Sequence, residues 1–171
     1  MAIEQPRYTV VVDDGACEIR AYDPMIVAVS VESDLRGYSG FSNVFDYIQG
    51  NNTTRQKIAM TAPVINDLEK TALTTAFVMP KAYRMDELPQ PQSTQLRLDE
   101  KPARLVAAIR FSGSVNDRLI TQKRSELLAW IKANGYFAIG STELARYNPP
   151  FIPGLFKRNE LWIEVAALPK P

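Results

Sequence analysis

The chain has 171 residues, of which 46% are hydrophobic and 23% are charged, with one cysteine and no histidine. A single cysteine excludes an internal disulfide, and the lack of histidine excludes an imidazole base, a His-ligated zinc and a proximal-histidine iron. Because 20 basic residues face 19 acidic ones, the net charge of +1 gives no electrostatic reason to expect nucleic acid as a partner.

The first half of the chain predicts strands around one short helix. Asp14-Gly15 and Asp23-Pro24 are typical turn pairs between β-branched segments. The expected strands are residues 7–13, 17–22, 25–32, 57–65 and 71–79. The helix is expected because Phe41, Val44, Phe45 and Ile48 recur at helical spacing, after a Ser39 cap and before Gly50.

A proline-rich, polar stretch at residues 79–93 predicts a long connection, after which the same order of elements returns. Further strands are expected at residues 95–99, 104–111, 142–147 and 160–166. Between them, Ser114 is the expected cap of a helix that runs to about residue 133 and ends at Asn134-Gly135.

The order of elements predicts one α+β domain over residues 1–171, with a largely antiparallel sheet. Residues 7–79 and 94–167 can be aligned as approximate internal repeats of β-β-α-β-β type. The N-terminus resembles no signal peptide, and the apolar runs are too short to cross a membrane. A cytoplasmic protein without a membrane span is therefore expected.

Several motifs in this order resemble the SOUL / haem-binding protein family. They include KI-x-MT-x-PV from Lys57, YNPP from Tyr147 and RNE-x-W from Arg158. The chain resembles, more distantly, the gyrase-inhibitor-like effector domains of multidrug-sensing regulators, which have a central ligand cleft. The resemblance implies a distorted antiparallel β-barrel with two flanking helices, built from an internal duplication.

The family resemblance implies that haem or another tetrapyrrole is the ligand, held in an apolar cleft beside the first helix. Since no histidine is available, we expect hydrophobic contact rather than histidine ligation. The helix has no Lys or Arg and carries Asp46, so the propionates would meet basic residues before and after it. The expected tetrapyrrole-binding residues are Arg36, Tyr38, Phe41, Phe45, Arg55, Lys57 and Met60.

The apolar and aromatic side chains of this region also have ordinary structural interpretations. Phe41, Val44, Phe45 and Ile48 form the stripe that a helix buries in a core, whereas Tyr38 and Tyr47 lie off that stripe and are open to an exposed role. Met60 can pack like most strand methionines, and Cys17 fits a buried thiol. Tyrosinate ligation of iron stays open, because no spacing selects one tyrosine.

Glu160 begins an otherwise apolar segment, so its carboxylate needs a partner or water. One interpretation is an ion pair with Arg20 or Arg146 that fixes the last strand. The alternative is an acid in a cleft that binds a cationic or aromatic ligand, as in a small-molecule sensor or hydrolase. Tyr147, Arg158 and Trp162 would line that cleft. No catalytic motif or metal-ligand pattern accompanies these residues, so an enzyme is the less favoured class.

Overall fold

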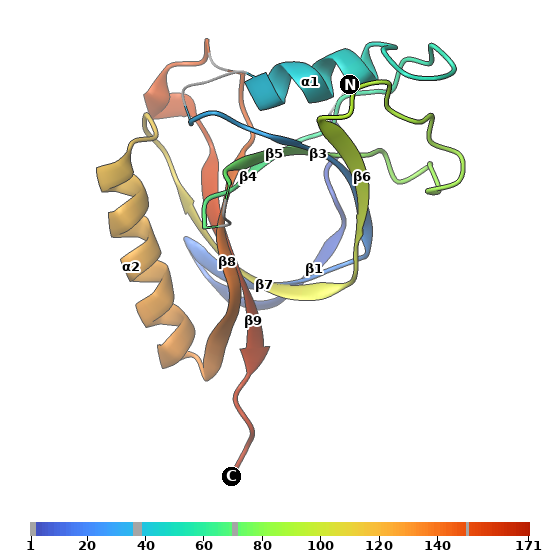
Figure 1. The fold of residues 1–171 in the computed structure, drawn as a ribbon. Coiled ribbons are helices and arrows are strands. Elements are labelled where there is room, and N and C mark those ends of the chain that lie inside the picture. The colour runs from blue at the N-terminus through green and yellow to red at the C-terminus, as the bar shows by residue number, and fades with distance from the viewer. Residues whose placement is uncertain (1–2, 36–38, 70–71, 150) are drawn as a thin grey trace. The chain divides into compact units, whose positions relative to one another are not determined.

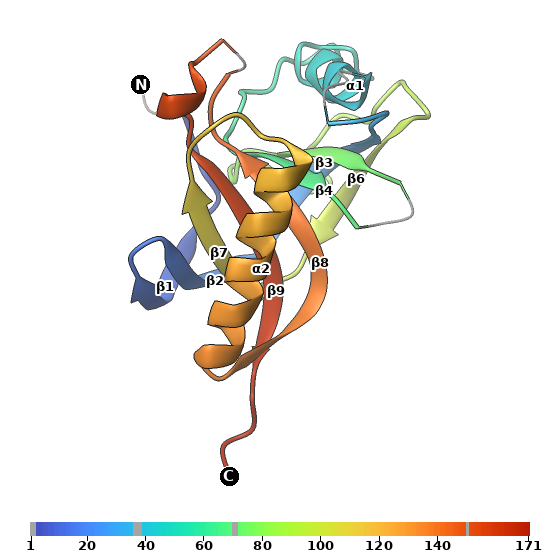
Figure 2. The ribbon, with the colours of Figure 1, turned by 90° about the vertical axis from the view of Figure 1, so that its left-hand side faces the viewer.

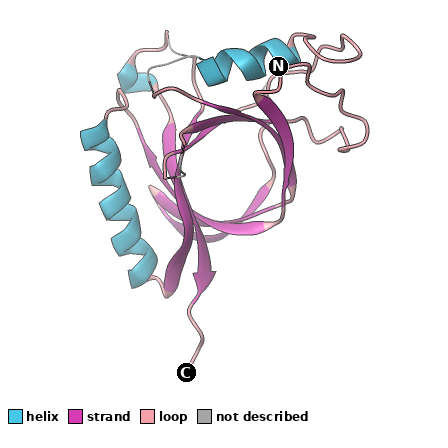
Figure 3. Ribbon diagram, viewed as in Figure 1, coloured by secondary structure: helices cyan, strands magenta, loops and turns pink. Residues whose placement is uncertain are grey.

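The computed structural model describes residues 3–35, 39–69, 72–149 and 151–171 (Figures 1 and 3). The elements in chain order are β1 (Tyr8–Asp14), β2 (Cys17–Tyr22), β3 (Met25–Val31), α1 (Ser39–Ile48), β4 (Val64–Asp67), β5 (Thr74–Val78), β6 (Leu96–Lys101), β7 (Arg104–Phe111), α2 (Asp117–Ala133), β8 (Tyr136–Arg146), the 3-10 helix η1 (Gly154–Phe156) and β9 (Asn159–Ala167). They form two compact units.

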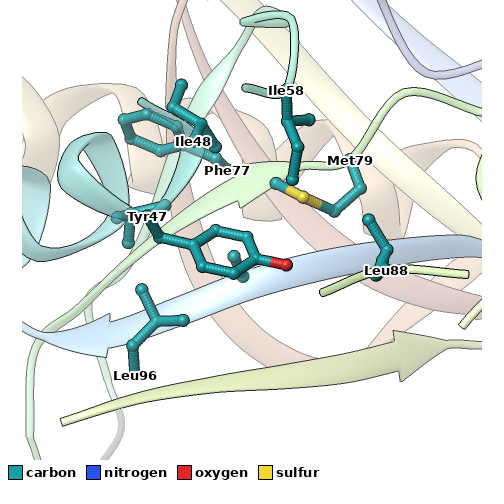
Figure 4. Packing of buried hydrophobic residues seen from close by; sticks show 9 residues of the cluster. Tyr47, Ile48, Ile58, Phe77, Met79, Leu88 and Leu96 are labelled. Carbon is teal, nitrogen blue, oxygen red and sulfur yellow. The ribbon is translucent and has the colours of Figure 1, made fainter. Parts of the chain in front are cut away.

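Unit 1 consists of Pro24–Pro102 with a short N-terminal piece that ends at Pro6. Its strands lie in the order β4-β5-β3-β6, and the neighbouring strands are antiparallel. Helix α1 packs on β3 and β5, because its buried side chains join those of the sheet in one apolar cluster (Figure 4). The fully buried members of the cluster are Ala28, Val44, Tyr47, Ile48, Ile58, Phe77, Met79, Leu88 and Leu96.

Unit 2 consists of Arg7–Asp23 and Ala103–Pro171. Its strands lie in the order β1-β2-β7-β9-β8 and are again antiparallel. Helix α2 covers β7, β8 and β9 and buries Leu127 and Ile131 (Figure 2). The unit therefore joins the two N-terminal strands of the chain to its second half.

The expected α+β class with a mostly antiparallel sheet and two helices is confirmed, and the strands expected at residues 17–22 and 104–111 have the predicted bounds. The closed barrel and the internal repeats remain predictions. No helix of the described ranges is long and apolar enough to cross a membrane.

Three expected boundaries are wrong. The strand expected at residues 142–147 begins already at Tyr136, as β8, because the chain pairs with β9 from Tyr136 onwards. Helix α2 is capped by Asn116 rather than Ser114, because the Asn116 backbone is extended and its side-chain oxygen accepts the Leu119 amide at 2.9 Å. The strand expected at residues 57–65 is reduced to β4 from Val64 onwards. Pro63 has no amide to donate to a neighbouring strand, which explains why regular pairing begins only after it.

Candidate functional site

Helix α1 carries two phenylalanines at the edge of the unit 1 core, of which Phe41 is half-buried and Phe45 is exposed. Phe41 and Phe45 are one turn apart, and their rings stack with centroids 5.8 Å apart and an interplanar angle of 12°. Phe41 also meets the buried Phe77 ring edge-on at 5.2 Å. Phe45 stays 37% exposed, so the stack extends the core of unit 1 to the surface.

The segment after α1 holds the other described members of the predicted site. Gly50 has φ +115°, and Arg55 adopts the left-handed region with φ +54°. Buried Asn52 ties this turn together: its amide donates to the Tyr47 and Gln56 carbonyls at 2.9 and 2.8 Å. Arg55 is thereby held on the outside of an ordered turn.

The chain then returns along the end of α1. The Ile58 amide donates to the Ile48 carbonyl at 2.8 Å, which fixes Lys57 and Ile58 beside the last turn of the helix. Lys57 is exposed, and Met60 is 39% exposed two residues beyond Ile58. We call Phe41, Phe45, Arg55, Lys57 and Met60 the α1 surface. Arg36 and Tyr38, which were also expected there, lie outside the described residues.

The expectation of an open, exposed role for Tyr47 is wrong. Tyr47 is buried, and its hydroxyl donates to the Pro89 carbonyl at 2.6 Å. Figure 4 shows its ring among Leu88, Met79 and Leu96. Burial raises the pKa of Tyr47 to about 12, and the neighbouring Tyr83 adds to the shift. Tyr47 is therefore a core residue with a satisfied hydroxyl group.

Buried Glu32 fixes the start of α1. One carboxylate oxygen accepts from the Ser39 hydroxyl at 2.8 Å and the Ser33 amide at 3.0 Å, and the other accepts from the Phe41 amide at 3.0 Å and the Thr75 hydroxyl at 3.1 Å. Burial alone would raise the pKa of Glu32, but the hydrogen bonds from Ser39, Ser33 and Phe41, with one from the Gly40 amide, lower it. The expected Ser39 cap is therefore wrong: Ser39 is the first residue of α1 and donates its hydroxyl to Glu32, whose carboxylate accepts the Phe41 amide in place of a capping side chain.

We expect Glu32→Gln to destabilise the protein by about 1–3 kcal/mol. Both carboxylate oxygens of Glu32 accept hydrogen bonds, and the glutamine NH2 group would face those donors without being able to accept from them. Since the folded pKa of Glu32 is lowered, its contribution to stability is present above the unfolded pKa of about 4.3 and is lost as the pH falls through the folded value. Urea unfolding at pH 7 and at acid pH measures both effects. Glu100→Gln on β6, where the side chain is exposed, is the control. Equal losses for both variants would contradict the capping role.

The second predicted site lies in unit 2, where Glu160 is fully buried. The Arg20 guanidinium binds it with two parallel hydrogen bonds of 2.8 and 2.7 Å. The Tyr147 hydroxyl and the Trp162 indole N–H donate to Oε1 at 2.7 and 3.1 Å, and Arg158 donates to Oε2 at 3.2 Å. We call Arg20, Tyr147, Arg158, Glu160 and Trp162 the Glu160 cluster.

The side chains of the Glu160 cluster meet because alternate residues of a strand point to the same face of the sheet. Glu18, Arg20 and Tyr22 share one face of β2, as Glu160 and Trp162 share one face of β9. The Arg20 Nε donates to Glu18 at 2.6 Å, and Tyr22 packs against Trp162 with ring centroids 4.9 Å apart. The cluster therefore ties β2 to β9 across β7, the strand between them.

The charges of the cluster keep Glu160 ionised. Burial alone would raise the pKa of Glu160, but hydrogen bonds and charge from Arg20, with hydrogen bonds from Tyr147 and Trp162, lower it to about 2. Burial and the Glu160 charge raise the pKa of Tyr147, which stays a neutral donor. The Arg158 guanidinium lies 4.0 Å from the Tyr147 ring centroid.

These contacts favour the structural interpretation of Glu160, with Arg20 as the partner rather than Arg146. Oε1 accepts three of the donors named above and Oε2 accepts two, so the carboxylate offers a ligand little unused capacity. Among the described residues, the contacts of Glu160 give no support to a sensor or hydrolase site. The described residues also contain no group of three or more His, Cys, Asp or Glu side chains that could hold a metal ion.

The comparisons with known proteins agree with one another. The family model described as "SOUL heme-binding protein" matches residues 3–164. Heme-binding protein 2 of Homo sapiens is 29% identical over 161 residues, covering 87% of this chain and 78% of the relative. Heme-binding protein 2 of Mus musculus is 27% identical over 178 residues, covering 95% and 86%.

Solved structures resemble the fold at low sequence identity. The EcmrR C-terminal domain has a TM-score of 0.68 at 11% identity, covering 94% of this chain and 99% of that one. A hydrolase from Listeria innocua has a TM-score of 0.59, also at 11% identity, covering 91% and 94%. At these identities the likeness concerns the fold alone.

Proposed function

The chain belongs to the SOUL haem-binding protein family, and from this premise we propose that it binds haem or another tetrapyrrole on the α1 surface. Apolar contact with the ring would supply the affinity, without a histidine ligand. The observation that carries this proposal is the Phe41–Phe45 stack, which is continuous with the core through Phe77 yet leaves Phe45 partly exposed. A flat porphyrin can cover such a surface, and burying apolar area favours binding by roughly 25 cal/mol per Å².

The chemistry of the surrounding side chains fits a tetrapyrrole. Arg55 and Lys57 are exposed cations after the helix and would meet the propionates. Bound haem would supply a redox-active iron, for which Met60 is an exposed soft donor. By contrast, Met79 and Cys17 are buried, and the hydroxyl of Tyr47 is engaged by Pro89.

A hemin titration followed at the Soret band tests this proposal. We expect saturable binding in the micromolar range, and a loss of about tenfold or more in affinity for Phe45→Asp, because a carboxylate would face the ring and the propionates. Phe137→Asp, which changes an exposed phenylalanine of unit 2, is the matched control and should bind like the unmodified protein. Equal affinity of both variants, or no saturable Soret shift, would sink the proposal.

We also infer that the chain contains an internal duplication. In unit 1, β3 precedes helix α1 in the chain, and β4 and β5 follow it. These three strands lie side by side in the sheet in the order β4-β5-β3. In unit 2, β7 precedes helix α2 in the chain, β8 and β9 follow it, and the sheet order is correspondingly β8-β9-β7. This shared order supports the proposal that the two halves descend from one repeated element. We also propose, from the family resemblance, that the strands close into a distorted β-barrel.

A further inference from the structure

The turn between β8 and β9 exposes the most accessible large apolar side chains of the described residues. Phe151, Leu155 and Phe156 are 82%, 77% and 72% exposed, whereas Ile3, the next such residue, is 57% exposed. We call residues 151–156 the apolar turn. Large exposed apolar groups gathered in one short segment mark an interaction site more often than scattered ones do.

The backbone of this turn is tied down although its side chains are not buried. The Gly113 amide donates to the Gly154 carbonyl at 2.8 Å, and the Phe156 amide donates to Pro153 at 2.9 Å. A Cβ on Gly154 would lie 2.8 Å from the Ser114 hydroxyl oxygen, so the close approach to Ser114 requires glycine. The apolar side chains are therefore presented by an ordered loop, which lies against Gly113 and Ser114 in the segment before α2.

The charge around the turn is positive. Residues 148–158 read NPPFIPGLFKR and contain no acid. Lys157 and Arg158 follow the turn directly, and Arg110, on β7 opposite Glu160, has a half-exposed side chain. Glu160, which pairs with both arginines, is fully buried, and Asp117, the first residue of α2, is followed in the sequence by Arg118. The apolar turn thus has a basic border.

From this combination we propose that the apolar turn docks the protein on the surface of a lipid bilayer that contains anionic headgroups. Phe151, Leu155 and Phe156 would enter the interface between headgroups and acyl chains, and the basic border would meet the phosphates. The proposal is independent of tetrapyrrole binding, because every residue it uses lies in unit 2.

The area of the turn favours a bilayer over a protein partner. Three side chains of this size offer about 500 Å² together, which is less than the roughly 800 Å² that each partner of a stable protein complex buries. A bilayer accepts a projecting turn without a matching cavity, and the affinity of such contacts rises with anionic lipid content.

Co-sedimentation with vesicles tests the proposal. Vesicles of equal parts phosphatidylcholine and phosphatidylglycerol should bind the protein, and vesicles of phosphatidylcholine alone should bind it more weakly. Phe151→Ser/Phe156→Ser should lower the partition coefficient by about tenfold or more. Phe137→Ser/Ile139→Ser on β8, which also removes two exposed apolar groups, is the control and should change it by less than about twofold. Far-UV circular dichroism checks that both variants fold.

A tryptophan reporter gives a second measurement. Phe156→Trp should show a blue-shifted emission on adding the anionic vesicles, and quenching by brominated acyl chains. Three outcomes would overturn the proposal: no binding to the anionic vesicles, equal partition coefficients for the two double variants, or reversible self-association in ultracentrifugation that Phe151→Ser/Phe156→Ser abolishes while vesicle binding is absent. The last result would assign the turn to a protein contact.

Discussion

Glu160→Gln is expected to destabilise the protein by about 3–5 kcal/mol, because it leaves a buried guanidinium without its counter-charge. Arg20 is 1% exposed and makes two of its hydrogen bonds to Glu160, at 2.8 and 2.7 Å. The neutral amide would accept fewer of these bonds and would point an N–H group at donors from Arg20, Tyr147 or Trp162. Equilibrium unfolding in urea at pH 7 measures the loss.

Two further variants test whether the loss of stability comes from leaving the buried Arg20 charge without Glu160. Glu18→Gln removes the other acid that pairs with Arg20. Because the Glu18 side chain is 16% exposed, this change should cost only about 1 kcal/mol of stability. The double variant Arg20→Met/Glu160→Leu removes both buried charges and should be more stable than Glu160→Gln alone. If Glu160→Gln is no less stable than Glu18→Gln, the central role assigned to the Glu160 cluster is wrong.

The same carboxylate gives the protein an acid-sensitive component of stability. The pKa of Glu160 is lowered to about 2 when folded and is about 4.3 when unfolded. The stabilisation is therefore complete above pH 4.3 and disappears as the pH falls toward 2, an effect on the order of 3 kcal/mol. Glu160→Gln should lack this part of the pH dependence.

The sequence predicts well those features that depend on neighbouring residues. Strands β2 and β7 are bounded by turn residues and rich in strand-forming side chains, so their limits follow from local pattern. Glu160 could be selected because a carboxylate in an apolar strand requires a partner, and Arg20 was one of two candidates. The choice between them depends on β2 and β9 flanking β7, which is a property of sheet order rather than of spacing.

Features that depend on distant partners escape sequence analysis. Tyr47 lies off the helical stripe, yet its hydroxyl meets the Pro89 carbonyl 42 positions away. Glu32 gave no signal, because its donors come from Ser39, Phe41 and Thr75. Strand alternation alone also could not show that Phe151 and Phe156 stay exposed while their backbone is held by residues before α2.

Phe77→Ala is expected to cost about 3–5 kcal/mol and to weaken hemin binding, because Phe77 supports the α1 surface from below. Phe77 is buried in β5, and its ring contacts Phe41 edge-on at 5.2 Å. Phe41 in turn stacks on Phe45, so removing Phe77 opens a cavity directly beneath the proposed ring contact. Urea unfolding measures the first effect and a hemin titration the second.

Leu127→Ala separates loss of stability from loss of the binding surface. Leu127 is fully buried in unit 2, so its truncation should cost about 2–5 kcal/mol while leaving the hemin affinity of the folded protein unchanged. Phe77→Leu is a milder change that keeps most of the core volume, and it should still lower hemin affinity several-fold because the edge contact with Phe41 is lost. Equal hemin affinities for Phe77→Leu and Leu127→Ala would show that the Phe41–Phe45 stack does not carry the ligand.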